Sequence, residues 1–234
     1  MIKILNELPT TAFNNALCVK ICSLYNAYGV SRDFCTFWTQ INGDNEITAI
    51  ICKFYSAITL CALNDANIQE LNEFFDIVGY TEIQSNVKLN KDGIEFDSVY
   101  LKSSGNQICD FSINIETAKA CYSILNQYPD EISLGQFDEW YVDISHRIRH
   151  KSAFIINNIN STALCLIGKN EALLSGIAVD TLHKSNGMGR ELINQICNLA
   201  ISGIFAICSK KNLGFYLNLG FKPQQKIYYY KGQY

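Results

Sequence analysis

The amino-acid sequence predicts a mixed α+β fold made of two similar halves. Runs rich in β-branched and aromatic residues alternate with segments in which apolar residues recur every three or four positions, so strands and helices are interspersed. The order helix, strand hairpin, strand, helix, strand occurs once before residue 105 and again after it. Repetition over this length indicates duplicated domains rather than a solenoid.

Each segment of the first half has its own pattern. Apolar residues at helical spacing predict a helix over residues 12–28. The segments 34–40 and 47–54 are typical of strands, and the sequence Asn-Gly-Asp-Asn between them predicts a hairpin turn. The remaining predicted elements are a strand at 57–63, a helix over 68–78 with Asn67 and Gly79 as its caps, and weaker strands near 81–89 and 98–102.

A short polar turn at residues 103–106 separates the halves, so we divide the chain into domains at 1–105 and 106–234. The second half is predicted to begin with a strand at 108–113 and helices at 116–128 and 137–150. Strands at 153–157, 162–168 and 172–179 then lead to a helix at 187–200. The last predicted elements are a strand at 204–208, a short helix at 213–219 and a strand at 225–230.

Composition excludes several classes of protein. Hydrophobic residues make up 48% of the 234 positions, which is ample for a packed core. The net charge of −3 argues against a nucleic-acid partner, because such proteins need a basic surface. The sequence shows neither a signal-peptide pattern nor an apolar run long enough to span a membrane. We therefore expect a cytoplasmic protein without a membrane partner.

The chain contains ten cysteines, which is many for its length. None forms a Cys-x-x-Cys pair, and no Cys/His cluster has the spacing of zinc ligands, so we expect no metal. Most of them lie among Ile, Leu, Val and Ala. We therefore expect reduced, buried cysteines that act as small hydrophobic residues.

The most informative stretch is 173–193, which reads as a buried strand, a basic turn with two glycines, and an amphipathic helix. Free N–H groups in the first turn of a helix and the helix dipole favour an anion at that point. Gly187 and Gly189 would let the backbone approach a phosphate, and His183, Lys184 and Arg190 add positive charge. The first half has Asn-Asp-Ala-Asn at 64–67 instead, so the phosphate site is predicted only once.

Two motifs in the second half resemble those of the GNAT superfamily of acyl-coenzyme A-dependent N-acyltransferases. Residues 184–189, Lys-Ser-Asn-Gly-Met-Gly, match the Arg/Gln-x-x-Gly-x-Gly/Ala signature, with Lys184 in place of Arg or Gln. Downstream, Phe215-Tyr-Leu-Asn-Leu-Gly-Phe221 matches the Phe/Leu-Tyr-x-x-x-Gly-Phe pattern. The resemblance covers about residues 106–234 and extends over 1–105 only as element order. It implies a central mixed, mostly antiparallel sheet flanked by helices, in tandem duplication.

The resemblance implies acetyl-CoA as co-substrate and gives its binding residues. The turn would hold the pyrophosphate through Lys184, Ser185, Asn186, Gly187, Met188, Gly189 and Arg190. The strand residues Ile177, Ala178 and Val179, splayed from their neighbour, would pair with the pantetheine arm through their backbone. Asn212 would contact the cofactor or cap a helix.

Tyr216 matches the tyrosine that in many family members donates a proton to the leaving CoA thiolate, with aromatic packing as the alternative role. The general base cannot be assigned from sequence. Glu139, Asp143, Glu171 and Asp180 are typical of solvated carboxylates, and His183 is more simply explained as a cation beside the phosphates.

The predicted function is therefore transfer of an acetyl group from acetyl-CoA to a primary amine of a small molecule or peptide, by direct attack in a ternary complex. The alternative is a non-catalytic module that binds or senses CoA. A nucleotide-binding protein of another class is disfavoured because the sequence has no Gly-x-x-x-x-Gly-Lys-Ser/Thr motif. The protein is expected to be a monomer or a homodimer. The first half would complete the acceptor cleft, replace a dimer partner or serve only as structure.

Overall fold

A computed structural model of the chain describes residues 1–9, 15–63, 65–132, 134–199 and 201–232. Within these residues, one sheet of eleven strands has the order β1-β2-β3-β4-β5-β11-β6-β10-β9-β8-β7, and six α-helices flank it. The strands pair in parallel at β4–β5 and β9–β10 and antiparallel elsewhere in this order. The predicted mixed, mostly antiparallel α+β fold is confirmed.

The elements follow the duplicated order. The first half contains β1 (Ile2–Ile4), α1 (Ala16–Tyr28), β2 (Cys35–Ile41), β3 (Ile47–Phe54), β4 (Ala57–Ala62), α2 (Ile68–Val78), β5 (Glu82–Ser85) and β6 (Ile94–Lys102). The second half contains α3 (Ile115–Leu125), α4 (Phe137–Arg149), β7 (Ala153–Asn158), β8 (Ser161–Ile167), β9 (Glu171–Val179), the short 3-10 helix η1 (Thr181–His183), α5 (Met188–Cys197), β10 (Gly203–Cys208), α6 (Lys210–Asn218) and β11 (Lys222–Lys231).

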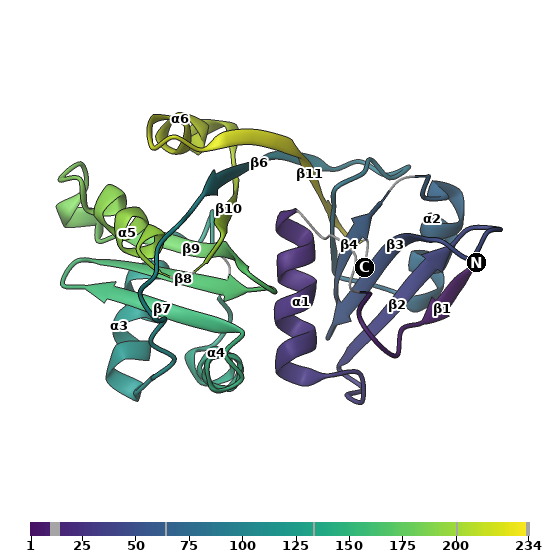
Figure 1. Cartoon of the computed structure of the whole chain (residues 1–234), viewed down its shortest axis with the longest axis horizontal. Coiled ribbons are helices and arrows are strands. Elements are labelled where there is room, and N and C mark those ends of the chain that lie inside the picture. The colour runs from purple at the N-terminus through teal and green to yellow at the C-terminus, as the bar shows by residue number, and fades with distance from the viewer. Residues whose placement is uncertain (10–14, 64, 133, 200, 233–234) are drawn as a thin grey trace.

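The two halves share the sheet by exchanging their last strands (Figure 1). β11, from the second half, lies between β5 and β6 of the first half, and β6 in turn pairs with β10 of the second half. Near the middle of the β6–β11 pair, Lys226 Nζ lies 2.7 Å from Asp97 Oδ1. Because each half depends on a strand of the other, the backbone hydrogen bonds at the centre of the sheet join residues far apart in sequence.

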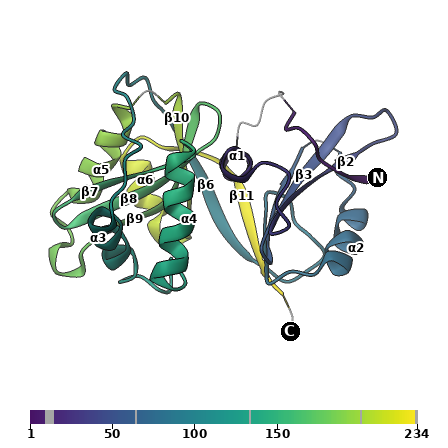
Figure 2. The same ribbon diagram turned by 90° about the horizontal axis from the view of Figure 1, so that it is seen from below.

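Helix α1 fills the space between the two halves of the sheet (Figure 2). Its side chains Leu17, Ile21 and Leu24 pack in the core of the first half, whereas Ala16 and Val19 pack in a core of the second half. The side chain of Asn15 caps the helix by accepting a hydrogen bond from the Cys18 N–H at 3.0 Å. One helix with two apolar faces therefore holds both halves together.

The other helices cover the outer faces. α2 packs Leu71 and Phe75 against the first half of the sheet. In the second half, α3 and α4 cover one face of the sheet, where they bury Cys121, Ile144 and Ile148. α5 and α6 cover the other face, where they bury Leu192, Ile196 and Tyr216. Among the described residues, no helix combines the length and the apolar character that a membrane span requires.

Three of the predicted strands differ from the structure. Residues 108–113 form no strand; Ile108 is 89% exposed, and the neighbourhood has only an isolated bridge between Gln107 and Leu199. The segment begins beside residues 198 and 199, which precede β10, and both edges of β10 itself are taken by β6 and β9. The predicted strand at 81–89 is also shorter, Glu82–Ser85, while the one at 98–102 begins earlier, at Ile94.

The expectation that every cysteine is reduced is also wrong at one pair. Cys18 of α1 and Cys61 of β4 form a disulfide, with their Cα atoms 6.0 Å apart. The eight others are free, and five of these are buried, as expected of small hydrophobic residues. Spacing along the sequence could not reveal the pair, because it joins a helix to a strand 43 positions away.

Candidate functional site

The candidate site begins where β9 and β10 separate. Their parallel pairing ends at Leu174 and Ala206, although β9 continues to Val179 and β10 to Cys208. On its other edge β9 has an irregular register with β8 that passes over Ser175, which is a β-bulge. Such bulges bend a strand and occur beside binding sites. The segment that contains Ile177, Ala178 and Val179 therefore presents an open strand edge toward β10, which an extended ligand could pair with.

The turn before α5 forms an uncapped helix N-terminus. Gly187 occupies the N-cap position with φ of 78°, a left-handed conformation that favours glycine, and no side chain caps the helix. The first intrahelical bond of this turn runs from the Glu191 N–H to the Gly187 carbonyl at 3.1 Å. The N–H groups of Met188, Gly189 and Arg190 therefore stay available for an anion.

Gly189 and Gly187 serve this turn in different ways. A Cβ at Gly189 would lie 3.2 Å from Cζ of Phe215 on α6, so glycine permits close packing of the two helices here. A Cβ at Gly187 would meet no atom within 4 Å, so the requirement there is conformational. The preceding Ser185 also has a positive φ, of 68°. The exposed turn residues Lys184, Ser185, Asn186 and Arg190 surround this point.

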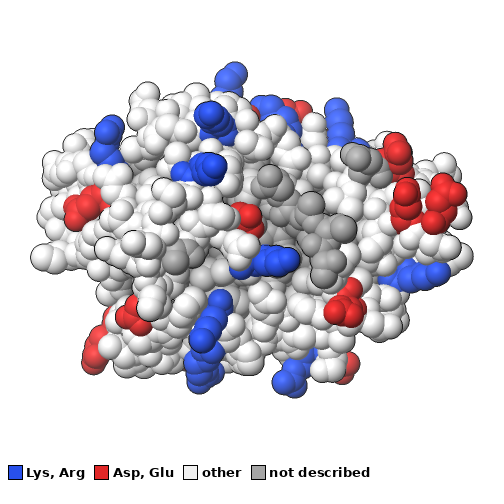
Figure 3. Space-filling model, viewed as in Figure 1, with Lys and Arg blue, Asp and Glu red and all other residues white. Residues whose placement is uncertain are grey.

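Positive charge at the turn comes from separate side chains. Nζ of Lys184 lies 4.7 Å from the centroid of the Tyr128 ring, a cation–π contact that orients it. His183 Nδ1 lies 3.4 Å from Asp180 Oδ1, and Asp180 caps η1. On the face in Figure 3, Lys and Arg are scattered rather than gathered in a broad patch. At the turn itself, the positive charge available to an anion comes from Lys184 and Arg190.

Tyr216 lies on α6 beside the end of β10. It is 7% exposed, and its ring packs edge-on against Phe215 and Phe221 at centroid distances of 5.1 and 5.3 Å. Burial, reinforced by Cys208 and Glu131 nearby, raises the pKa of its phenol far above the ordinary value. The phenol is therefore protonated at any physiological pH, which a proton donor requires; its packing role is evident in the same contacts.

Glu131 is a site residue that sequence reasoning missed. It lies between α3 and α4, and its carboxylate accepts hydrogen bonds from Asn212 Nδ2 at 2.9 Å and from Lys211 Nζ at 3.1 Å. These bonds lower the pKa of Glu131, with a further contribution from the positive charge of Lys184. Asn212 does not cap α6, whose N-cap is Ser209, and its side chain donates to this carboxylate. Its contact with the cofactor stays a prediction. No motif marks a loop glutamate, so only the fold could reveal it.

The other acidic candidates have structural partners. Asp143 accepts hydrogen bonds from Tyr28 and from Arg147 Nε, the latter at 2.9 Å, and so joins α4 to α1. Glu171 accepts a hydrogen bond from Ser202 Oγ at 3.1 Å at the beginning of β9. These contacts give neither carboxylate a place beside Tyr216.

The corresponding position in the first half is closed. Parallel pairing of β4 and β5 ends at Leu60 and Ser85, as it does between β9 and β10. Here, however, the side chain of Asn86 completes the ladder: its Oδ1 accepts from the Ala62 N–H and its Nδ2 donates to the Ala62 carbonyl, both at 2.7 Å. The strand edge that stays open in the second half is thus occupied in the first.

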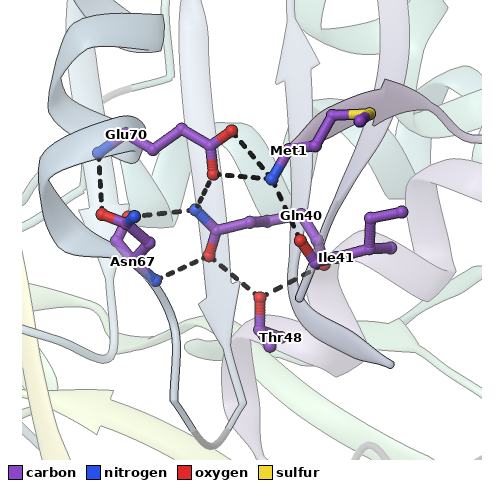
Figure 4. A network of polar contacts seen from close by, with 6 residues as sticks. All are labelled: Met1, Gln40, Ile41, Thr48, Asn67 and Glu70. Carbon is purple, nitrogen blue, oxygen red and sulfur yellow. Dashed lines mark hydrogen bonds and ion pairs between the residues drawn. The ribbon is translucent and has the colours of Figure 1, made fainter. Parts of the chain in front are cut away.

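The N-terminus of α2 is likewise satisfied by the chain itself (Figure 4). The Asn67 side chain accepts from the Glu70 N–H at 3.1 Å, and Gln40 Nε2 donates to Glu70 Oε2 at 2.7 Å. The amino group of Met1 lies 2.9 Å from Glu70 Oε1. A carboxylate therefore lies at the end of α2 where the second half has free N–H groups, and this disfavours a phosphate.

Replacement of Asn86 by Ala should lower the free energy of unfolding by about 1–3 kcal/mol, because the Ala62 N–H and carbonyl lose their partners. Chemical denaturation measures this change. Asn90→Ala, which alters an exposed asparagine in the following loop, is the matched control and should change stability by less than about 0.5 kcal/mol. Equal stability of both variants would mean that Asn86 does not support β4.

Several solved structures share this architecture at low sequence identity. A GCN5-related N-acetyltransferase from Kribbella flavida superposes with a TM-score of 0.57 at 10% identity, covering 95% of this chain and 97% of that one. One from Sphaerobacter thermophilus gives 0.54 at 8%, covering 98% and 95%. A tandem GNAT protein from the clavulanic acid biosynthesis pathway gives 0.52 at 8%, covering 100% and 99%.

The comparisons by sequence find no counterpart: no family model matches the chain, and no curated protein matches it. The likeness is therefore one of backbone arrangement over the whole chain, and at these identities it establishes the fold.

Proposed function

We propose that this chain, which has the GNAT fold in tandem form, transfers an acetyl group from acetyl-CoA to a primary amine. One observation carries the proposal: in the second half an open strand edge and an uncapped helix N-terminus lie at consecutive places along the chain. The first accommodates an extended amide-bearing arm, and the second accommodates a phosphate. In acetyl-CoA these two groups are covalently joined.

The residues present fit acetyl-CoA. Ile177, Ala178 and Val179 would offer backbone groups to the pantetheine amides, with the Val179 carbonyl shared with the Tyr128 hydroxyl. The first turn of α5 would offer N–H groups to the pyrophosphate. Lys184 and Arg190 supply charge beside it. The acetyl thioester would then lie near the ends of β9 and β10, on the face of the sheet that α6 and its Tyr216 cover. Holding both reactants in this place supplies the proximity on which such a transfer depends.

The proposed reaction converts acetyl-CoA and a protonated amine into an N-acetylated amine and free CoA, and it releases one proton. The acceptor enters as an ammonium ion and loses a proton to become the nucleophile. Its nitrogen forms a bond to the acetyl carbon, and the carbon–sulfur bond of the thioester breaks. Tyr216 gives its phenolic proton to the departing thiolate, and the proton lost by the new amide nitrogen restores the phenol through solvent. The products are an N-acetylated amine and free CoA.

The closed first half predicts one acetyl-CoA site per chain. Calorimetric titration of the purified protein with acetyl-CoA measures the stoichiometry directly, and release of free CoA thiol in the presence of primary amines measures transfer. One-site binding with thiol release is the expected result. Binding without transfer to any amine would favour the non-catalytic CoA-binding module, and no binding by the folded protein would overturn both functions.

A further inference from the structure

We propose that Glu131 is the anchor for a positively charged acceptor and that Lys211 holds the place of the acceptor's ammonium group when no acceptor is bound. This inference rests on the proposed function and names its substrate class: primary amines that are cations at neutral pH. It is carried by the position of Glu131 across the opening between β9 and β10, and by the partners of its carboxylate.

The segment 127–132 is fastened to the side of the opening formed by β9. The Tyr128 hydroxyl donates a hydrogen bond to the Val179 carbonyl. The side chain of Gln127 donates to Asp180 Oδ2 at 3.0 Å and accepts from the Thr181 N–H at 2.9 Å. Three hydrogen bonds thus hold this segment along the end of β9, where the strand no longer pairs with β10.

From this segment the Glu131 carboxylate reaches the other side of the opening. Its partners Lys211 and Asn212 lie in the first turn of α6, which follows β10 directly. Glu131 therefore spans the opening from the β9 side to the β10 side. Its charge also acts on Tyr216, whose phenol pKa it raises. Asn212, which donates to this carboxylate, lies four residues before Tyr216 on α6, so the two side chains share one face of that helix.

The ion pair between Glu131 and Lys211 is exposed to solvent and can be replaced by another cation. The Lys211 side chain is 79% exposed and that of Glu131 is 40% exposed, so water solvates both groups and their separation costs little. The hydrogen bonds from Lys211 and Asn212 keep the pKa of Glu131 below its ordinary value. A permanently charged carboxylate binds a cation well but is a poor proton acceptor at neutral pH. This favours recognition over general-base catalysis.

The charge of the reactants decides which of them Glu131 contacts. Acetyl-CoA carries negative phosphates and a neutral thioester, so a carboxylate offers it no attraction. The acceptor, before it loses its proton, is the reactant with a positive charge. The ammonium of such an acceptor can replace Lys211 Nζ, and the released lysine is then free beside the phosphate-binding turn.

The test compares two kinds of primary amine with the acetyl-CoA-dependent enzyme. n-Butylamine, cadaverine and spermidine are cations at pH 7, whereas O-butylhydroxylamine is a neutral primary amine. Glu131→Gln should raise the KM for the cationic amines about tenfold or more, with a smaller change in kcat, and leave the KM for O-butylhydroxylamine within about twofold. Lys211→Met should have the opposite sign and lower the KM for the cationic amines, because the competing ammonium is gone.

Asp130→Asn is the matched control. It makes the same change of charge one position away, at an exposed carboxylate for which the structure shows no partner among the described residues. It should leave all four amines unaffected. The inference is overturned if Glu131→Gln affects charged and neutral amines equally, or if the wild-type protein binds acetyl-CoA yet shows no preference for cations. If the folded wild-type protein does not bind acetyl-CoA, the proposed function itself is refuted.

Discussion

Replacement of Tyr216 by Phe should lower kcat about 100- to 1,000-fold while the affinity for acetyl-CoA stays within about threefold of wild type. The ring packs against Phe215 and Phe221, and phenylalanine keeps these contacts. Only the hydroxyl is lost, and with it the proton for the departing thiolate. Because burial raises the pKa of this phenol far above its ordinary value, the wild-type group stays protonated through neutral pH. Thiol release under saturating acetyl-CoA measures kcat, and calorimetry measures the affinity.

Tyr230→Phe is the matched control for this change. Tyr230 is another buried tyrosine, on β11, which packs in the core beneath α2, and its hydroxyl accepts a hydrogen bond from the Leu89 N–H at 2.8 Å. Its replacement should lower stability by about 1 kcal/mol and leave kcat unchanged. If Tyr216→Phe turns over as fast as the wild type, the role of Tyr216 is confined to packing, and another group must protonate the thiolate.

Local sequence patterns predict much of this fold because each reports a local cause. The helix at 68–78 agrees with α2 at both ends, since Asn67 and Gly79 are caps that act within one turn. The hairpin of β2 and β3 also follows from alternation and turn residues. The turn before α5 has the conformation that its glycine implies, with a left-handed Gly187 and no side-chain cap.

Features that depend on distant partners are absent from those patterns. The exchange of β6 and β11 pairs strands whose partners lie far away in the sequence. The predicted strand at 108–113 does not form, because a short apolar run does not by itself determine whether a strand finds a partner. Glu131 contacts Lys211 of α6, 80 positions later in the sequence. A single glutamate in a loop belongs to no periodic pattern, so the sequence does not predict this contact. Pairings of this kind require the structure.

The duplication also explains why the two halves differ in chemistry while sharing a fold. The same separation of two parallel strands occurs at β4–β5 and at β9–β10. In the first half Asn86 and the residues around Glu70 satisfy the polar groups that the separation exposes. In the part of the second half that the structure describes, no side chain caps α5, and the Val179 carbonyl is the group at the end of β9 that a side chain, Tyr128, satisfies. A buried backbone group left unpaired is costly, so an open edge of this kind is expected to be retained where a ligand completes it.

Replacement of Gly187 by Glu should weaken acetyl-CoA binding at least about 100-fold, which corresponds to about 2.7 kcal/mol. A side chain at this position has open space, so no neighbouring atom need move, and the remaining cost is the strain of a positive φ. It would place a carboxylate beside the free N–H groups of α5, where the pyrophosphate must lie. Repulsion between like charges and competition for the same donors then both oppose binding. Calorimetric titration with acetyl-CoA measures the loss.

Two controls separate charge from backbone strain. Gly187→Gln imposes the same positive φ of 78° on a side chain of nearly the same size but adds no charge, so it should bind acetyl-CoA far better than Gly187→Glu. Gly29→Glu adds the same charge at another glycine with a positive φ, of 63°, and open space, at the end of α1, and should bind like the wild type. Equal losses in the Gln and Glu variants would assign the effect to strain. Unchanged binding in Gly187→Glu would remove this turn from the cofactor site. Gly189 is the weaker choice for such a test, because a side chain there would press on Phe215 and disturb α6 itself.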